Sequence, residues 1–308
     1  MDVVQPSRVL CDERPQPRLI GRESEVAAII ALLGRLDVRL VTLTGPGGVG
    51  KTRLARQVMD EARDCFDEVA FVPLAAIHDP DLVVPTIARV CDVPEAGETP
   101  LVQRLALALA RRRRLLVLDN LEQVPEAAAR LGDLLSRAAP LSILATSRVR
   151  LGLDDEQELA VSPLAAPDAR SRRLPPLSAR DAETFGAVAL FVERAKEADR
   201  RFFLTDENAD VVAAICRRLD GLPLAIELAA ARLRLLSAPA LLELLEHRMA
   251  LLTGGPRDEP DRLRTMRDSI AWSYDLLDAR RQTLFRRLSV FEGGFTLEAA
   301  VAVVNGVG

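Results

Sequence analysis

One eight-residue stretch constrains the fold of this chain more than any other feature. Residues 45–52 read Gly-Pro-Gly-Gly-Val-Gly-Lys-Thr and match the pattern G-x-x-x-x-G-K-[ST] without a mismatch. An apolar, β-rich run over residues 38–44 precedes it, and a helical pattern over 51–62 follows. Glycines let successive backbone amides converge on phosphate oxygens, and a helix N-terminus adds a partial positive charge. The stretch therefore predicts a phosphate-binding loop between a strand and a helix.

Lysine usage supports this interpretation. The chain has 308 residues and 41 basic side chains, but only Lys51 and Lys196 are lysines. Because the chain otherwise uses arginine for its positive charges, Lys51 is expected to have a specific role, namely to bind the β- and γ-phosphates with its ammonium group. The hydroxyl of Thr52 is suited to bind Mg²⁺. We expect the nucleotide to contact the loop and the first turn of the helix, namely Gly45, Pro46, Gly47, Gly48, Val49, Gly50, Lys51, Thr52 and Arg53.

A later buried strand ends in a carboxylate. The apolar run 115–118 leads into Asp119, which we expect to be the second Mg²⁺ anchor. Glu122 follows three residues later and is a candidate general base that polarises the attacking water. The alternative for Glu122 is a surface glutamate at the start of a helix. Asn120 lacks a basic group and could only orient water.

The strand expected at 143–146 ends at the same edge of the sheet, where open α/β sheets bind their ligands. Arg148 follows it, and an arginine there could reach the γ-phosphate and report its presence. Arg150 is a competing candidate, and an ordinary solvated arginine is the alternative for both. The candidate catalytic set is therefore Lys51, Asp119, Glu122 and Arg148, with Thr52 and Asp119 as metal ligands.

Up to residue 162, short β-rich runs alternate with helical patterns, which predicts βαβ units and a mainly parallel, doubly wound sheet. Beyond residue 180 only helical periodicity is visible. The expected organisation is a flexible lead-in at 1–18, a nucleotide-binding domain at 19–165, a proline-rich linker at 166–180, a helical lid domain at 181–255 and a third, incomplete unit at 262–308. The chain stops about 45 residues into this last unit, so we expect it to be a fragment of a longer protein.

Composition excludes several other functions. The formal net charge is −4, which gives no global basic surface for nucleic acid. The longest stretch without a charged residue covers 11 positions, 40–50, whereas a membrane helix needs roughly 18. The four cysteines lack C-x-x-C spacing, which favours reduced thiols in a cytoplasmic protein over a zinc site or disulfide framework.

Several motifs then follow one another in a recognisable order: residues 19–23 (Leu-Ile-Gly-Arg-Glu), the phosphate loop, 116–120 (Leu-Val-Leu-Asp-Asn), 146–148 (Thr-Ser-Arg) and 221–225 (Gly-Leu-Pro-Leu-Ala). The ordered set resembles the nucleotide-binding module of STAND ATPases, the NB-ARC-like group. It is most similar to bacterial LuxR-type and antibiotic-regulatory transcriptional regulators. The resemblance spans about residues 18–304, and 215–233, 272–277 and 291–295 strengthen it.

The resemblance implies an α/β P-loop NTPase of the additional-strand type, in which the Arg148 strand lies between the loop strand and the Asp119 strand. A helical domain and a partial winged-helix domain would follow. Ile20, Gly21 and Arg22 would border the adenine and ribose, Pro223 would close over the adenine, and Arg148 would sense the γ-phosphate. The cofactors implied are ATP or ADP with Mg²⁺.

The function implied is a switch with slow ATP hydrolysis, in which ADP holds the modules closed and ATP opens them for self-association. This chain departs from the family pattern in three places. Asn120 stands where many relatives have a second acidic residue, no histidine follows His247, and we see neither a DNA-reading helix-turn-helix nor a repeat sensor. DNA contact is therefore expected only through domains outside this chain.

Two other functional classes remain open from the sequence. A turnover ATPase machine would hydrolyse many ATP molecules per second and would need a second arginine finger and a substrate-engaging pore loop, neither of which we identify. A non-hydrolysing interaction module would keep the loop only as a scaffold. The intact Lys51, Thr52 and Asp119 argue against that reading.

Overall fold

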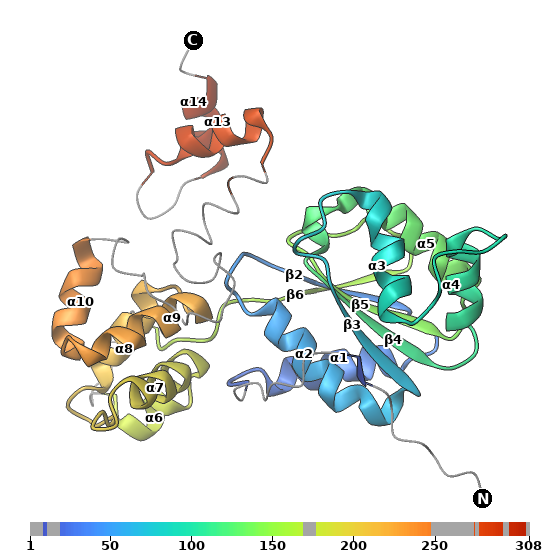
Figure 1. Cartoon of the computed structure of the whole chain (residues 1–308). Helices are drawn as coiled ribbons and strands as arrows, with labels where there is room; N and C mark the ends of the chain where they lie inside the picture. Colours follow the sequence, from blue (N-terminus) through green and yellow to red (C-terminus); the bar gives the residue numbers. More distant parts are fainter. Residues whose placement is uncertain are drawn as a thin grey trace, which may run out of the picture.

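The computed structural model describes residues 9–10, 19–168, 177–247, 274, 277–291 and 296–305. Within these residues, six parallel strands form one sheet in the order β1-β3-β4-β5-β2-β6 (Figure 1). The strands are β1 (Val9–Leu10), β2 (Leu40–Thr44), β3 (Glu68–Pro73), β4 (Arg114–Asp119), β5 (Leu141–Thr146) and β6 (Glu156–Ala160).

The position of β5 decides the geometry of the site. It pairs with β2 on one side and with β4 on the other, so the strand that leads to Arg148 separates the loop strand from the Asp119 strand. This is the expected additional-strand order. Because all three strands are parallel, Thr44, Asp119 and Thr146 end at the same edge of the sheet.

Helices cover both faces of the sheet (Figure 1). On one face lie α1 (Glu23–Gly34) and α2 (Lys51–Glu61), and on the other lie α3 (Val83–Val90), α4 (Leu101–Leu109) and α5 (Ala128–Arg137). Along β4, Leu115 and Val117 pack with the first layer, whereas Leu116 and Leu118 pack with the second. Strands buried on both faces need continuous apolar runs, which is why their sequences do not alternate. The doubly wound α/β architecture is confirmed.

The edge strand β1 was not expected. Val9 and Leu10 pair with Val69 and Ala70 of β3, within the stretch for which the sequence predicts a loose lead-in. A run of two apolar residues among prolines and charged residues is too short to show the periodicity of a strand. The pairing supplies β3 with backbone partners on its outer side.

A helical unit follows the sheet, as expected. It comprises α6 (Ala179–Glu183), α7 (Gly186–Ala198), α8 (Ala209–Arg218), α9 (Pro223–Ala230) and α10 (Ala238–His247). Its core is built around the fully buried Phe191, whose ring meets that of Phe202 edge-on at 6.1 Å. The Ser178 hydroxyl caps α6 by accepting from the amide of Asp181, and Pro223 occupies the first position of α9, where its missing N–H costs nothing.

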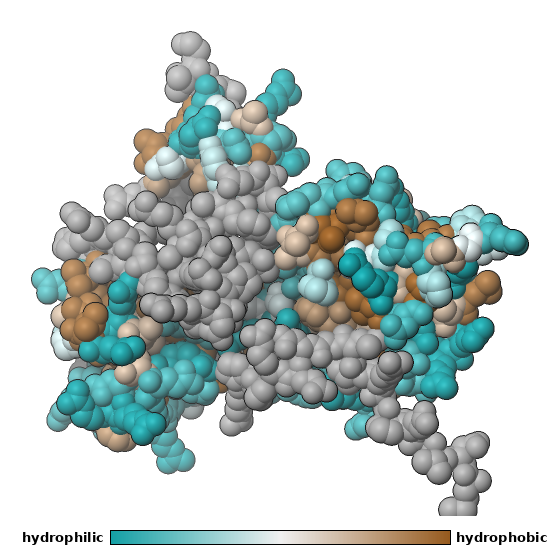
Figure 2. All heavy atoms as spheres, in the orientation of Figure 1, coloured by the Kyte–Doolittle hydropathy of each residue, from teal (hydrophilic) through white to brown (hydrophobic). Residues whose placement is uncertain are grey.

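Two further helices lie near the C-terminus, α13 (Ala279–Leu288) and α14 (Leu297–Asn305) (Figure 1). Of residues 262–277, the start of the unit expected to resemble a winged helix, only Tyr274 and Leu277 fall within the described residues, so the first part of that expectation lies outside them. Hydrophilic residues cover the lower left of Figure 2, where Figure 1 places α6 and α7. Among the described helices, none has both the length and the apolarity that a membrane crossing requires.

A backbone hydrogen bond at Gly221 joins the helical unit to the segment that follows the sheet. Its carbonyl accepts from the amide of Leu164 at 2.9 Å, and its φ of +66° lies in the left-handed region. A Cβ at this position would collide with the carbonyl oxygen of Leu164. Only glycine therefore fits where the two units meet.

We predict that Gly221→Ala destabilises the chain more than Gly152→Ala does. Gly152 has a similar φ of +76°, but a Cβ there would meet no atom within 4 Å. The control should lose about 1 to 2 kcal/mol of unfolding free energy from the left-handed backbone alone. Gly221→Ala should lose about 1 to 3 kcal/mol more of unfolding free energy, because the added methyl group also collides with the Leu164 carbonyl. Urea denaturation measures both losses, and equal values would contradict the packing argument.

Candidate functional site

The phosphate loop joins the end of β2 to the start of α2 and depends on glycine at specific points. Gly45 has a φ of +145° and Gly50 a φ of +98°. A Cβ on Gly45 would lie 2.8 Å from the carbonyl oxygen of Val161, which follows β6. These conformations wrap the loop around the N-terminus of α2, where unpaired helix amides favour an anion.

Lys51 folds back over this loop. Its ammonium donates to the carbonyl oxygens of Gly45 (2.7 Å) and Pro46 (3.1 Å), and the residue is only 8% exposed. Burial lowers the pKa of this ammonium, while the nearby carboxylates of Glu122 and Asp119 act in the opposite direction. A desolvated ammonium fixed at the mouth of an amide-lined loop is suited to bind phosphate.

Asp119 accepts hydrogen bonds from two hydroxyl groups on neighbouring elements. Thr52 Oγ1 and Thr146 Oγ1 each donate to its Oδ1 at 2.7 Å, and the residue is almost fully buried. Thr52 and Asp119 thus present hydroxyl and carboxylate oxygens side by side, which is the hard donor set that Mg²⁺ prefers. Within the described residues no group of three or more His, Cys, Asp or Glu could hold a metal by itself. A Mg²⁺ ion here would complete its shell with water and phosphate oxygens.

The segment after β4 turns back toward the site at Asn120. Its φ of +67° lies in the left-handed region, which asparagine tolerates better than most residues. Its amide donates to Thr146 Oγ1 at 2.9 Å. The turn brings the buried Glu122 side chain within 3.5 Å of the Arg148 guanidinium, so the candidate base and the candidate sensor form an ion pair. Burial lowers the pKa of Arg148, and Glu122 opposes that shift.

The structure also separates Arg148 from its competitor. Arg150 is more than half exposed and lies 3.7 Å from Glu156 and 3.6 Å from Glu158, both on β6. Arg148 is mostly buried and is the one that meets Glu122. Of the two arginines, Arg148 therefore lies with the other candidate catalytic residues.

The residues expected to border the adenine lie where the sheet and the helical unit meet. Ile20 packs against the core of the helical unit, and Gly21 approaches Gly186 so closely that a Cβ would lie 2.8 Å from its Cα. The Arg22 guanidinium is buried and donates to the carbonyl oxygens of Val49 and Ser162. Its polar atoms are thus already engaged by the protein.

Helix α9 contacts the phosphate loop directly, which the sequence did not reveal. The amide of Leu224 donates to the carbonyl oxygen of Gly48 at 3.2 Å, and the Pro223 ring lies near Gly50. Arg53, expected to contact the nucleotide, forms an ion pair with Glu227 on α9. The sequence analysis also did not predict that Thr146 donates a hydrogen bond to Asp119. The position of Thr146 in the Thr-Ser-Arg motif that ends at Arg148 is the signal that could have revealed this role.

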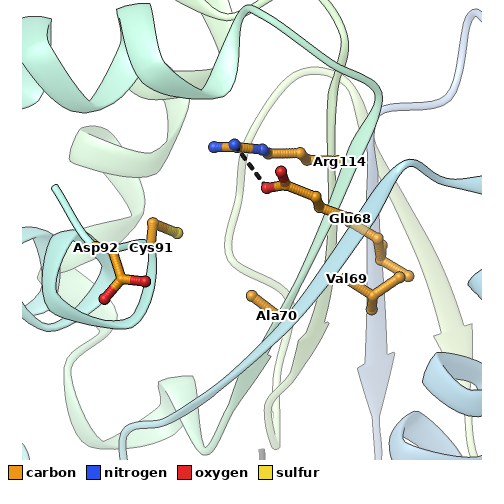
Figure 3. A pocket seen from close by; sticks show the side chains of 7 residues that line it. Glu68, Val69, Ala70, Cys91, Asp92 and Arg114 are labelled. Carbon is orange, nitrogen blue, oxygen red and sulfur yellow. Dashed lines mark ion pairs between the residues drawn. The ribbon is translucent and has the colours of Figure 1, made fainter. Parts of the chain in front are cut away.

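A separate small pocket of about 130 Å³ opens at the opposite end of the strands (Figure 3). It is bordered by Glu68 and Arg114, which begin β3 and β4 and form a 2.6 Å ion pair, and by Cys91. Burial raises the pKa of the Cys91 thiol to about 11, so it stays protonated at neutral pH and is a poor nucleophile. The pocket therefore lies away from the phosphate loop, which follows the other end of β2.

Comparison with known proteins agrees with this geometry. The NB-ARC domain family matches residues 22–151. Rv0890c of Mycobacterium tuberculosis, which carries the name of an HTH-type transcriptional regulator, is 42% identical over 269 residues. That match covers 87% of this chain but only 28% of the relative, so the chain spans little more than a quarter of its length.

A second protein of M. tuberculosis, Rv0894, is 37% identical over 286 residues, with 92% of this chain and 68% of the relative covered. Among solved structures, a STAND protein with a tetratricopeptide repeat sensor from Pyrococcus horikoshii aligns with a TM-score of 0.44 and 15% identity. That alignment covers 92% of this chain and 37% of the other. With its phosphate loop, its sheet order and these sequence relatives, the chain belongs to the NB-ARC group of STAND P-loop NTPases.

Proposed function

We propose that the chain is an ATP/ADP-controlled switch module with slow Mg²⁺-dependent ATP hydrolysis. One observation carries the proposal: α9 of the helical unit bonds to the phosphate loop itself, through Leu224 and Gly48. A change of nucleotide at the loop and a change in the position of the helical unit are therefore physically linked. ADP would favour the docked arrangement, and ATP would favour release and self-association.

The residues of the site divide into three roles. Lys51 and the loop amides would hold the phosphates, and Thr52 with Asp119 would hold Mg²⁺, which when bound offsets negative charge on the phosphate oxygens. Glu122 would orient and deprotonate water, and Arg148 would bind the γ-phosphate. The Glu122–Arg148 ion pair supports slow turnover, because the two side chains are engaged with each other and the pair must open before Glu122 can meet a water molecule.

The biological setting is inferred from the relatives. Rv0890c is named as a transcriptional regulator, and this chain covers 28% of it. We infer that the module controls a signal-responsive regulator of the LuxR type, with DNA contact made by other domains. A cytoplasmic location is consistent with the free thiols of Cys65, Cys91 and Cys216.

We predict that Lys51→Ala abolishes measurable binding of ADP and Mg·ATP while the melting temperature stays close to that of the wild type. The chain offers a matched control, because its other lysine, Lys196, is exposed on α7. Lys196→Ala should bind nucleotide normally. Isothermal titration calorimetry measures the affinities, and unchanged binding by Lys51→Ala would defeat the proposal.

We also predict that Arg148→Ala weakens ATP binding by about tenfold, the scale of one charge-assisted hydrogen bond, and leaves ADP binding nearly unchanged. Arg150→Ala is the control and should change neither affinity. Glu122→Gln should bind both nucleotides and hydrolyse ATP more slowly than the wild type. Wild-type turnover far above about 10⁻² per second, the scale of unassisted switch NTPases, would instead favour a turnover ATPase.

A further inference from the structure

Three consecutive carbonyl groups of the phosphate loop are bound from outside the loop. The carbonyl of Gly48 accepts from the amide of Leu224 on α9 (3.2 Å), and that of Val49 accepts from the Arg22 guanidinium (3.3 Å). The carbonyl of Gly50 accepts from the amide of Leu54 within α2 (2.9 Å). The orientation of three successive peptide planes is thus fixed.

This orientation determines where the amides point. In a trans peptide the C=O and the following N–H point in opposite directions. With the carbonyls of Gly48, Val49 and Gly50 directed at their donors, each following N–H group, ending with that of Lys51, points away from the donor that binds the carbonyl of its own peptide. Successive amides directed to one side form an anion-binding nest.

The three donors differ in origin. Leu54 belongs to α2, so that bond forms whenever the helix does. Leu224 belongs to α9 of the helical unit, and Arg22 precedes α1, so neither is part of the phosphate-loop motif. Two of the three peptide planes therefore depend on groups far away in sequence.

Arg22 is held firmly enough to orient a peptide. It is 4% exposed, its guanidinium forms a 2.7 Å ion pair with Glu25, and it also donates to the carbonyl oxygen of Ser162. A planar guanidinium bound on several sides keeps its direction, which a single flexible donor would not.

We infer that Arg22 and the backbone N–H of Leu224 are positioning groups, which pre-orient two loop amides for the polyphosphate of the nucleotide. This rests on the proposed binding of a nucleotide at this loop. It adds that docking of α9 raises the affinity of the loop for phosphate. By linkage, a bound diphosphate, such as that of ADP, strengthens docking of α9 by the same factor.

Inorganic pyrophosphate separates this role from a contact with adenosine, because it carries no base or ribose. The full chain is titrated with ADP and with pyrophosphate, each with Mg²⁺, in the wild type and in Arg22→Gln. We expect both ligands to bind about tenfold more weakly in the variant, the scale of one lost charge-assisted bond. Arg35→Gln is the control, since Arg35 is exposed at the end of α1 and pairs with Asp37, and both affinities should stay unchanged.

Arg22→Lys keeps a charged donor and should restore part of both affinities, which a general loss of packing would not explain. Weaker ADP binding with unchanged pyrophosphate binding would overturn the inference, because it would assign Arg22 to the adenosine. Unchanged binding of both ligands would overturn it as well. If the wild type binds neither ligand, the proposed function itself fails.

A second pair of variants, at Leu224, tests the contribution of α9 and leaves Arg22 unchanged. Leu224→Pro removes the N–H in the first turn of α9, where proline is tolerated, whereas Leu224→Ala shortens the side chain and keeps the N–H. Pyrophosphate should bind the proline variant at least about fivefold more weakly than the alanine variant, the scale of one neutral hydrogen bond. Far-UV circular dichroism checks that both variants are folded, and equal pyrophosphate affinities would overturn the role of Leu224.

Discussion

The site depends on the carboxylate of Asp119, which is hydrogen bonded to two threonines. Thr52 begins α2 directly after the loop, and Thr146 ends β5, so one buried oxygen joins three elements that come from distant parts of the sequence. The bonds are possible only because β5 lies between β2 and β4. The order of the strands therefore determines which side chains meet at the edge of the sheet, since it places the candidate metal ligands and the candidate sensor next to one another.

Much of this arrangement could be predicted from the sequence, because local patterns carry it. The loop motif is contiguous, and buried parallel strands appear as apolar runs that end at their polar residues. Asp119, Glu122 and Arg148 are each predicted as site residues by their distance from such a strand end, and their roles stay predictions. That the last two would pair with each other was not evident, because the turn at Asn120 that directs Glu122 back depends on a left-handed backbone.

The parts that could not be predicted depend on long-range contacts. The bonds of Arg22 to Val49 and Ser162, and of Leu224 to Gly48, join residues up to about 180 positions apart, and no local periodicity reports such a pairing. Arg53 shows the same limitation: its position after Thr52 suggests a ligand contact, whereas its ion pair with Glu227 depends on where α9 lies. The resemblance implies that Pro223 closes over the adenine, which stays a prediction, and it gives no reason for the bond of Leu224 to the loop.

The sheet has a practical consequence for cutting this protein into pieces. The segment that matches the NB-ARC domain, 22–151, includes neither β1 at 9–10 nor β6 at 156–160, and these are the two outermost strands. A fragment trimmed to those limits would expose the backbone amides and carbonyls of β3 on one side and of β2 on the other. Unpaired sheet edges recruit strands from other molecules, so such a fragment is expected to aggregate. The outer strands thus protect the central part of the sheet, although neither of them carries a residue of the phosphate loop.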